Sequence, residues 1–284
     1  MRLDRIGTLL VSRLMDAGVT RTAAGIPVLM YHSVSDDPEP GVSPYYRLAT
    51  SPETFRRQMS SLREHGYRTV DLARALHLLE TNTHGGQRLV VITFDDGFRD
   101  FHTAAWPILS QFGFTATMFV PTEFIATSRK SFKGRECLTW NEVRELHAQG
   151  AEFGSHTVSH PKLHGLAWEK VRAELTGSRA TLEDELQQPV RSFAYPYAFP
   201  QEDAAFVARF KHELTDAGFT ESVTTVIGRA LPGLDRLSVS RLPVNEADDP
   251  ALFATKLGGA YDWVGTFQAA FRRNRNALAT LRPA

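Results

Sequence analysis

The segment Val91-Ile92-Thr93-Phe94-Asp95-Asp96-Gly97 ends an apolar run in two adjacent carboxylates and a glycine. Neighbouring aspartates repel each other unless a positive group holds them, and Gly97 lets the backbone turn at this point. A metal ion would supply the missing positive charge. Taken alone, the segment could also be a turn in which Asp-Asp-Gly only caps the following helix.

A second candidate is the pair His156 and His160 in the segment Gly154-Ser155-His156-Thr157-Val158-Ser159-His160-Pro161. This spacing can bring both imidazoles to one ion and is found in many zinc sites. Two histidines and one aspartate leave metal positions open for water and substrate, which is the arrangement of a catalytic rather than a structural site.

A third candidate is the segment from Arg191 to Ala198, which ends an apolar run in aromatic residues around a proline. It could be only core and turn. Alternatively, Arg191 could pair with a catalytic carboxylate while the turn at Tyr197 offers a backbone N–H to an oxyanion. The segment by itself leaves both interpretations open.

The elements that must position these residues alternate between short apolar runs and helix-length amphipathic segments. The predicted strands are Pro27–Tyr31, Leu89–Phe94, Thr115–Val120, Ala151–Gly154, Arg191–Tyr195, Ser222–Val226 and Leu237–Leu242. The predicted helices are Pro52–His65, Leu72–Glu80, Asp100–Phe112, Asn141–Gln149, Ala167–Glu185 and Asp203–Ala217. This alternation favours parallel strands in a βα architecture.

A (β/α) barrel is favoured over an open sheet because the polar candidates follow separate apolar runs. They are His32, Asp95, Asp96, His156, Tyr197 and, as a further strand-end residue, Arg241. In a (β/α) barrel the carboxyl ends of the strands converge on one face, where active sites lie.

The composition indicates one globular domain and excludes some partners. The chain has 284 residues, and its 32 Lys and Arg balance its 32 Asp and Glu, so no overall field attracts nucleic acid. The single Cys137 excludes an internal disulfide and a thiolate metal cluster. No signal peptide or membrane-spanning segment is recognised, so we expect a cytoplasmic protein, with contact to a membrane surface as an option.

In combination, the three segments resemble the first three motifs of the polysaccharide deacetylase family, also called the NodB homology domain or carbohydrate esterase family 4. The opening Pro27-Val28-Leu29-Met30-Tyr31-His32-Ser33-Val34 is similar to the branch that contains the biofilm poly-N-acetylglucosamine deacetylases. The resemblance covers residues 26–245. It implies a distorted (β/α) barrel, preceded by an extension at 1–25 and followed by a helical tail at 246–284.

The resemblance also implies the activity and the roles of the site residues. The expected reaction removes N-acetyl groups from an N-acetylated glycan such as an exopolysaccharide, with release of acetate. Asp96, His156 and His160 would bind a divalent metal, with zinc the first choice and Co²⁺ or a similar ion the alternative. Asp95 would be the general base and Arg191 would orient it, while the backbone at Tyr197 would bind the oxyanion.

The chain departs from the family pattern at two places. Ala198 stands where a glycine usually follows the aromatic turn, and the late Leu-x-His motif that supplies the general acid in many members is replaced by Ser238-Val239-Ser240-Arg241-Leu242-Pro243. In the biofilm branch the acid role moves to the histidine of the first strand, which is His32 here.

Two other functions remain open: hydrolysis of an amide in a small nitrogenous compound, and a glycan-binding barrel without turnover. The tail from Tyr261 contains aromatic and basic residues, namely Trp263, Phe267, Phe271, Arg272, Arg273, Arg275 and Arg282. Packing of this tail on the barrel is preferred to a basic amphipathic helix on a membrane surface.

Overall fold

The computed structural model describes residues 3–16, 25–265 and 268. Its main body is a barrel of seven parallel strands. The strands are β1 (Val28–Tyr31), β5 (Leu89–Phe94), β6 (Thr117–Val120), β9 (Glu152–Ser155), β10 (Ser192–Ala194), β11 (Glu221–Ile227) and β12 (Val239–Pro243). All seven predicted strands are therefore present.

The barrel closes because β1 pairs with both β12 and β5. The order around it is β1-β12-β11-β10-β9-β6-β5, and every neighbouring pair is parallel. A short strand β4 (Arg68–Thr69) adds to β5. The barrel is distorted: the register shifts between Val223 and Ile227, and β9 meets β10 only through Ser155 and Phe193. The expected distorted (β/α) barrel is thus confirmed.

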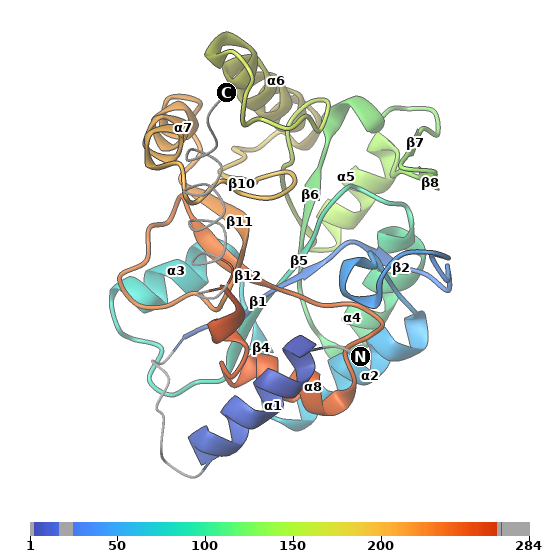
Figure 1. The fold of residues 1–284 in the computed structure, drawn as a ribbon. Coiled ribbons are helices and arrows are strands. Elements are labelled where there is room, and N and C mark those ends of the chain that lie inside the picture. The colour runs from blue at the N-terminus through green and yellow to red at the C-terminus, as the bar shows by residue number, and fades with distance from the viewer. Residues whose placement is uncertain (1–2, 17–24, 266–267, 269–284) are drawn as a thin grey trace.

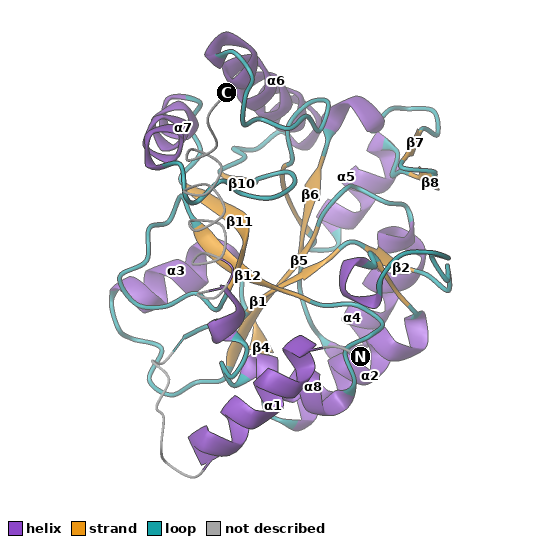
Figure 2. Ribbon diagram, in the orientation of Figure 1, coloured by secondary structure: helices purple, strands orange, loops and turns teal. Residues whose placement is uncertain are grey.

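Helices surround the strands (Figure 1, Figure 2). They are α2 (Pro52–Glu64), α3 (Leu72–Glu80), α4 (Trp106–Phe112), α5 (Trp140–Ala148), α6 (Trp168–Leu186) and α7 (Ala204–Asp216). Local signals set their ends. Thr139 and Glu142 form a reciprocal capping box at the start of α5, and Gly113 ends α4 with a left-handed φ of 66°.

The predicted helix over 100–112 has two parts. Its first turn, Phe101–Ala105, is π-helical, and α4 proper begins at Trp106. The physical reason is Pro107, the second residue of α4, which has no N–H to donate to the preceding turn.

Smaller elements lie in the loops. They are β2 (Ser33–Val34) paired with β3 (Ala49–Thr50), the 3₁₀ turns η1 (Pro44–Tyr46) and η3 (Thr122–Phe124), and the antiparallel hairpin β7 (Ser131–Phe132) and β8 (Arg135–Glu136). The sequence pattern predicts none of these elements. They are too short for hydrophobic periodicity to reveal them.

Two elements flank the barrel in sequence, α1 (Leu3–Asp16) before it and α8 (Pro250–Leu257) after it. Figure 1 shows them side by side, and the Tyr261 hydroxyl donates to Asp4 while Trp263 Nε1 donates to Thr8 Oγ1. We propose residues 26–245 as the barrel domain, with 1–25 and 246–284 as its flanking segments.

Of the expected helical tail at 246–284, the structure describes 246–265 and 268. The tail residues Phe267, Phe271, Arg272, Arg273, Arg275 and Arg282 lie outside the described residues. Contact of the tail with a membrane surface stays a prediction. Among the helices in the described part of the chain, none is long and apolar enough to cross a membrane.

Side chains alternate between the barrel interior and the layer under the helices. Val28 and Val91, paired in register, belong to the buried cluster that also contains Phe119, whereas Leu29 and Ile92 belong to the larger cluster under the helices. The interior is therefore a packed core below the site rather than a channel.

Gly154 in β9 is needed for this packing. It pairs with Phe119 of β6, and a Cβ at position 154 would lie 2.5 Å from Phe119 Cε1 and 2.6 Å from Ser192 Oγ. Atoms cannot approach so closely, so any side chain here would push two neighbouring strands apart.

We predict that Gly154→Ala lowers the free energy of unfolding by about 1–3 kcal/mol, the usual cost of overpacking a core. The measurement is equilibrium urea denaturation. Gly258→Ala is the matched control, because its φ is −71° and its added Cβ would meet nothing closer than 3.6 Å. If the two variants are equally stable, the close packing of β9 against β6 does not constrain the barrel.

Candidate metal and catalytic site

Three side chains converge where β5 and β9 end. Asp96 follows β5, and His156 and His160 follow β9. Asp96 Oδ1 lies 3.2 Å from His160 Nε2 and 3.7 Å from His156 Nε2, and all three side chains are buried. The three ligand atoms lie within 4.8 Å of one another, as one ion would require.

The donor atoms fit a divalent ion. His156 Nδ1 donates to the Ala194 carbonyl at 2.7 Å, which leaves its Nε2 lone pair facing the other ligands. Burial lowers the pKa of His156 to about 4, so its imidazole is neutral at neutral pH, the form that binds metal. Asp96 Oδ1 has no hydrogen-bond partner of acceptable geometry among the described residues. A set of two imidazole nitrogens and one carboxylate oxygen suits zinc and similar ions.

Asp96 is held in its ionised form. Burial raises the pKa of its carboxyl group, but His160, His32 and Lys133 together outweigh burial and bring the pKa well below the usual range of an aspartate. Lys133 Nζ lies 2.9 Å from Asp96 Oδ2, the oxygen that does not face the histidines. The carboxylate therefore presents one oxygen to the metal site and the other to a lysine.

Asp95 is positioned by an arginine other than the expected one. The Arg241 guanidinium donates to Asp95 Oδ1 at 2.8 Å and to Oδ2 at 2.7 Å, and its Nε donates to the Thr224 carbonyl at 3.0 Å. Arg241 has no exposed surface. Burial raises the pKa of Asp95, but Arg241 more than offsets this and holds it below the ordinary value. Asp95 is thus an oriented, ionised carboxylate.

The expected role of Arg191 is wrong. Arg191 is exposed and lies immediately before β10, whereas Asp95 lies immediately after β5. In a parallel barrel the starts and the ends of strands lie at opposite ends of the structure. The Arg191 side chain is therefore on the wrong side of the barrel to reach Asp95.

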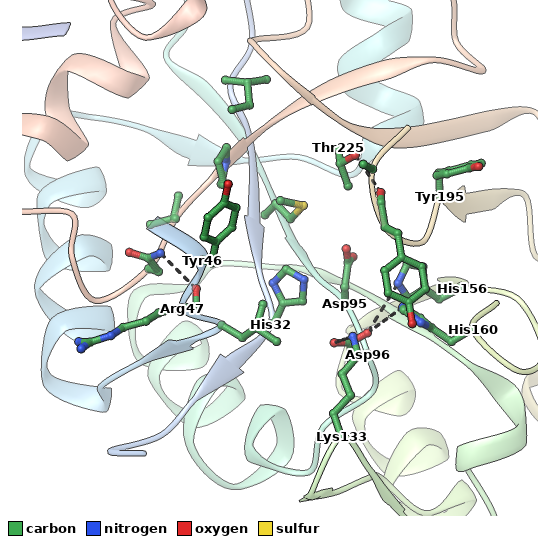
Figure 3. Close-up of a pocket in the computed structure, with 18 of the residues that line it drawn as sticks. His32, Tyr46, Arg47, Asp95, Asp96, Lys133, His156, His160, Tyr195 and Thr225 are labelled. Carbon is green, nitrogen blue, oxygen red and sulfur yellow. Dashed lines mark hydrogen bonds and ion pairs between the residues drawn. The ribbon is translucent and has the colours of Figure 1, made fainter. Parts of the chain in front are cut away.

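His32 follows β1, the strand between β5 and β12, and lines the same cleft as Asp95 and Asp96. Figure 3 shows its imidazole directed toward the two carboxylates. Its ring makes no hydrogen bond that ties it to another described residue, and burial lowers its pKa although Asp96 and Asp95 oppose this. A ring placed in this way is free to exchange a proton with a bound substrate.

Tyr197 lies at the mouth of the cleft. Its ring centroid is 4.7 Å from that of His160, and its carbonyl accepts from Thr225 Oγ1 at 2.9 Å. No described residue accepts a hydrogen bond from its backbone N–H. The turn thus leaves the Tyr197 N–H without an acceptor in the described chain, even though Ala198 replaces the glycine of the family pattern.

Backbone strain is concentrated here. Within the described ranges, the non-glycine residues with positive φ are eight: Glu39, Asn82, Asp96, Lys133, Thr157, His160, Gln187 and Tyr197. Four of them, Asp96, Lys133, His160 and Tyr197, line one cleft. Each such residue costs about 1–3 kcal/mol and persists where the surroundings enforce it, which is typical of functional sites.

The cleft has a volume of about 420 Å³. Figure 3 shows Tyr46 on the side of His32, and the histidine ligands on the side of Tyr195. The Asn245 amide anchors the loop before β3 through the carbonyls of Pro44 and Arg47. The two aspartates and the two histidines therefore lie in a cleft that has tyrosines in both walls.

Sequence reasoning missed Lys133 and gave no role to Arg241. Lys133 had one recoverable signal, the following Gly134, because glycine readily adopts the positive φ that a two-residue hairpin turn requires. For Arg241 the only sequence signal is its position within an apolar run. Neither signal predicts that Arg241 pairs with Asp95 or that Lys133 pairs with Asp96.

Comparison with known proteins is consistent with this geometry. Residues 82–215 match the family model described as polysaccharide deacetylase. YxkH of Bacillus subtilis (strain 168), whose name places it among the polysaccharide deacetylases, is 28% identical over 246 residues, which are 85% of this chain and 77% of that protein.

Two further similarities are informative. The poly-β-1,6-N-acetyl-D-glucosamine N-deacetylase of Escherichia coli (strain K12) is 31% identical over 142 residues, which span 47% of this chain but only 20% of that protein. The structure of the Streptococcus pyogenes deacetylase PplD in complex with acetate superposes with a TM-score of 0.70 at 25% identity, over 83% of this chain and 99% of that one.

We predict that Arg241→Gln lowers the free energy of unfolding by about 3–5 kcal/mol, because it leaves the buried Asp95 charge without its partner. Arg191→Gln, in contrast, should change stability by no more than about 0.5 kcal/mol, since the side chain is exposed. Urea denaturation at neutral pH measures both. Equal effects in the two variants would contradict the assignment of Arg241 as the partner of Asp95.

Proposed function

The chain belongs to the polysaccharide deacetylase family, and we propose that it hydrolyses the N-acetyl groups of an N-acetylated glycan in a metal-dependent reaction. The observation that carries the proposal is the division of labour between two adjacent carboxylates. Asp96 faces the two histidines, whereas Asp95 is held by Arg241 with its charge retained. A purely structural metal site would have no use for the second carboxylate.

The nature of the relatives supports the glycan assignment. The E. coli relative is named for poly-β-1,6-N-acetyl-D-glucosamine, and the PplD structure contains acetate, the expected second product. Glucosamine-based oligosaccharides are therefore the first substrates to test.

A divalent ion, with zinc the first choice, would be held by Asp96, His156 and His160 and would supply Lewis acidity that polarises the acetyl carbonyl and acidifies water. The residues of the chain would do the rest. The Asp95 carboxylate takes the proton from the attacking water, and Arg241 keeps that carboxylate ionised and oriented. The Tyr197 backbone N–H donates to the developing oxyanion.

The amine must be protonated before it leaves, and we propose His32 as the donor. Its ring faces the cleft, which Asp95 also lines, without another hydrogen-bond partner in the described chain. Because burial lowers the pKa of His32, its protonated form is a stronger acid than an exposed imidazolium. Substitution of His32 should thus affect the departure of the amine more than the attack of water.

We predict that removing the metal with a chelator abolishes acetate release from N-acetylglucosamine oligosaccharides and that Zn²⁺ or Co²⁺ restores it. Asp95→Asn should retain its metal but lose about 10²–10⁴-fold in turnover, since it removes the general base. Asp96→Asn should lose metal as well as turnover. Metal content by atomic emission and acetate release are measured on each variant.

Two results would contradict these assignments. Full activity in metal-free protein would exclude the metal-dependent reaction, and equal loss of metal in both variants would mean that the two carboxylates share one role. An assay of ammonia release from ureides alongside the glycan assay separates deacetylation from hydrolysis of a small nitrogenous compound.

We predict that His32→Ala keeps its metal and its substrate affinity while kcat falls, with a smaller loss on an acetyl ester than on the N-acetyl amide. The reason is that an alcohol leaves more readily than an amine and needs less protonation. Kinetics on matched O-acetyl and N-acetyl substrates provide the test. Equal losses on both substrates, together with weaker metal binding, would instead indicate that His32 only supports the ligands.

A further inference from the structure

Lys133 places a positive charge on the metal site from an element that lies outside the barrel. Its Nζ is 2.9 Å from Asp96 Oδ2, although about two thirds of the lysine side chain is buried and the carboxylate almost wholly so, with exposed fractions of 32% and 1%. No family motif discussed above contains this lysine. Figure 3 shows it reaching Asp96 from the side away from Asp95.

The hairpin that carries Lys133 is built to hold it there. Lys133 and Gly134 have φ values of 51° and 77°, as a tight two-residue turn between β7 and β8 requires. The Lys133 ammonium lies 4.8 Å from the centre of the Phe132 ring, and that ring packs against His160 at 5.0 Å. The turn therefore rests directly on one of the metal ligands.

A second contact ties the hairpin to the segment after His32. Arg135 donates to Ser33 Oγ at 2.7 Å and to Ser35 Oγ at 3.1 Å, and it pairs with Asp37 at 2.7 Å. Ser33 also donates to Asp100. The base of the hairpin is thus fixed to the loop after β1 on one side and its tip to Asp96 on the other.

The charges in the cleft balance in pairs. Asp95 is paired with Arg241 and Asp96 with Lys133, and an imidazole adds no negative charge whether it is neutral or protonated. A bound divalent ion would therefore leave the site with a clear excess of positive charge. Such an excess repels the ion but attracts an oxyanion or a carboxylate.

We propose that Lys133 is a charge-balancing residue of the metal site, which weakens the hold on the ion and strengthens the attraction for the acyl oxygen of the substrate. It pairs with Asp96 Oδ2, the oxygen that does not face the histidines, and its charge opposes that of the ion. The inference rests on the proposed function, since it concerns the same metal site.

Two consequences of removing Lys133 compete. Loss of the ion pair frees Asp96 to rotate, which would weaken metal binding, while loss of the positive charge removes a repulsion, which would strengthen it. Asp96 remains buried and is still faced by both imidazoles, so little rotation is open to it. The electrostatic effect should therefore prevail, and metal affinity and turnover should change in opposite directions.

The test is Lys133→Met, which keeps an unbranched side chain only one atom shorter and removes its charge. Zn²⁺ affinity of the metal-free protein is measured by competition with a chromophoric chelator, and kcat by acetate release. We expect binding about tenfold tighter, equivalent to about 1.4 kcal/mol, and kcat lower by about tenfold or more. Lys133→Arg keeps the charge, so its Zn²⁺ affinity and kcat should stay close to those of the wild type.

Lys162→Met is the matched control. Lys162 Nζ lies 5.6 Å from the Tyr197 ring, much as Lys133 Nζ lies 5.8 Å from it, but Lys162 is exposed and forms no ion pair with Asp96. Its removal should change neither the metal affinity nor kcat. Lys133→Gln provides a second neutral variant, and thermal melting of each metal-free protein identifies any variant that fails to fold.

The outcomes separate this inference from the proposed function. Unchanged metal affinity in both neutral variants, or weaker binding with a parallel loss of kcat, would overturn the role of Lys133 and leave the metal-dependent deacetylase intact. A wild-type protein that binds no Zn²⁺ would overturn both. Tighter binding in the variants of a protein that releases no acetate would support Lys133 and contradict the proposed reaction.

Discussion

A guanidinium with no exposed surface can exist inside this barrel only because Asp95 lies opposite it. The pair joins β5 and β12, the two strands that flank β1, so it forms only when β1 has closed the barrel between them. Removal of either partner would leave an uncompensated charge in the core, which proteins tolerate poorly. Closure of the barrel and pairing of the candidate base with its arginine are therefore coupled.

The neighbouring carboxylate, Asp96, faces the same cleft because the backbone turns at this residue. Consecutive side chains of a strand point to opposite faces, so Asp95 and Asp96 could not both face the cleft if β5 continued past Phe94. The strand ends there, and Asp96 takes a φ of 74° followed by 67° at Gly97. A Cβ at position 97 would lie 3.1 Å from Ile125 and 3.2 Å from Val120, so glycine suits both the turn and the packing. The left-handed conformation of Asp96 and Gly97 thus gives the two adjacent carboxylates different partners.

The remaining parts of the site come from loops rather than from strands. His32 and the turn at Lys133 lie on segments that bond to each other through Arg135, Ser33 and Ser35. Loops fixed in this way can keep the Lys133 ammonium beside Asp96 without the rigidity of the barrel beneath them. The cleft therefore combines Asp95, which is buried and paired with Arg241, with Lys133, which is paired with Asp96 but partly exposed.

The sequence by itself determined the strand and helix alternation, the closed parallel architecture and the grouping of Asp96, His156 and His160. These depend on local periodicity, on short spacing and on the rule that strand ends converge. The sequence could not identify which basic residues pair with Asp95 and Asp96. The Arg241–Asp95 contact joins residues 146 positions apart, and the Lys133–Asp96 contact depends on how a four-residue hairpin folds over the strand ends. Arg191, which belongs to a recognisable motif, lies at the opposite end of its strand. Which arginine neutralises Asp95 is decided by the direction of each side chain in the closed barrel, because at these distances only tertiary structure sets which charges meet.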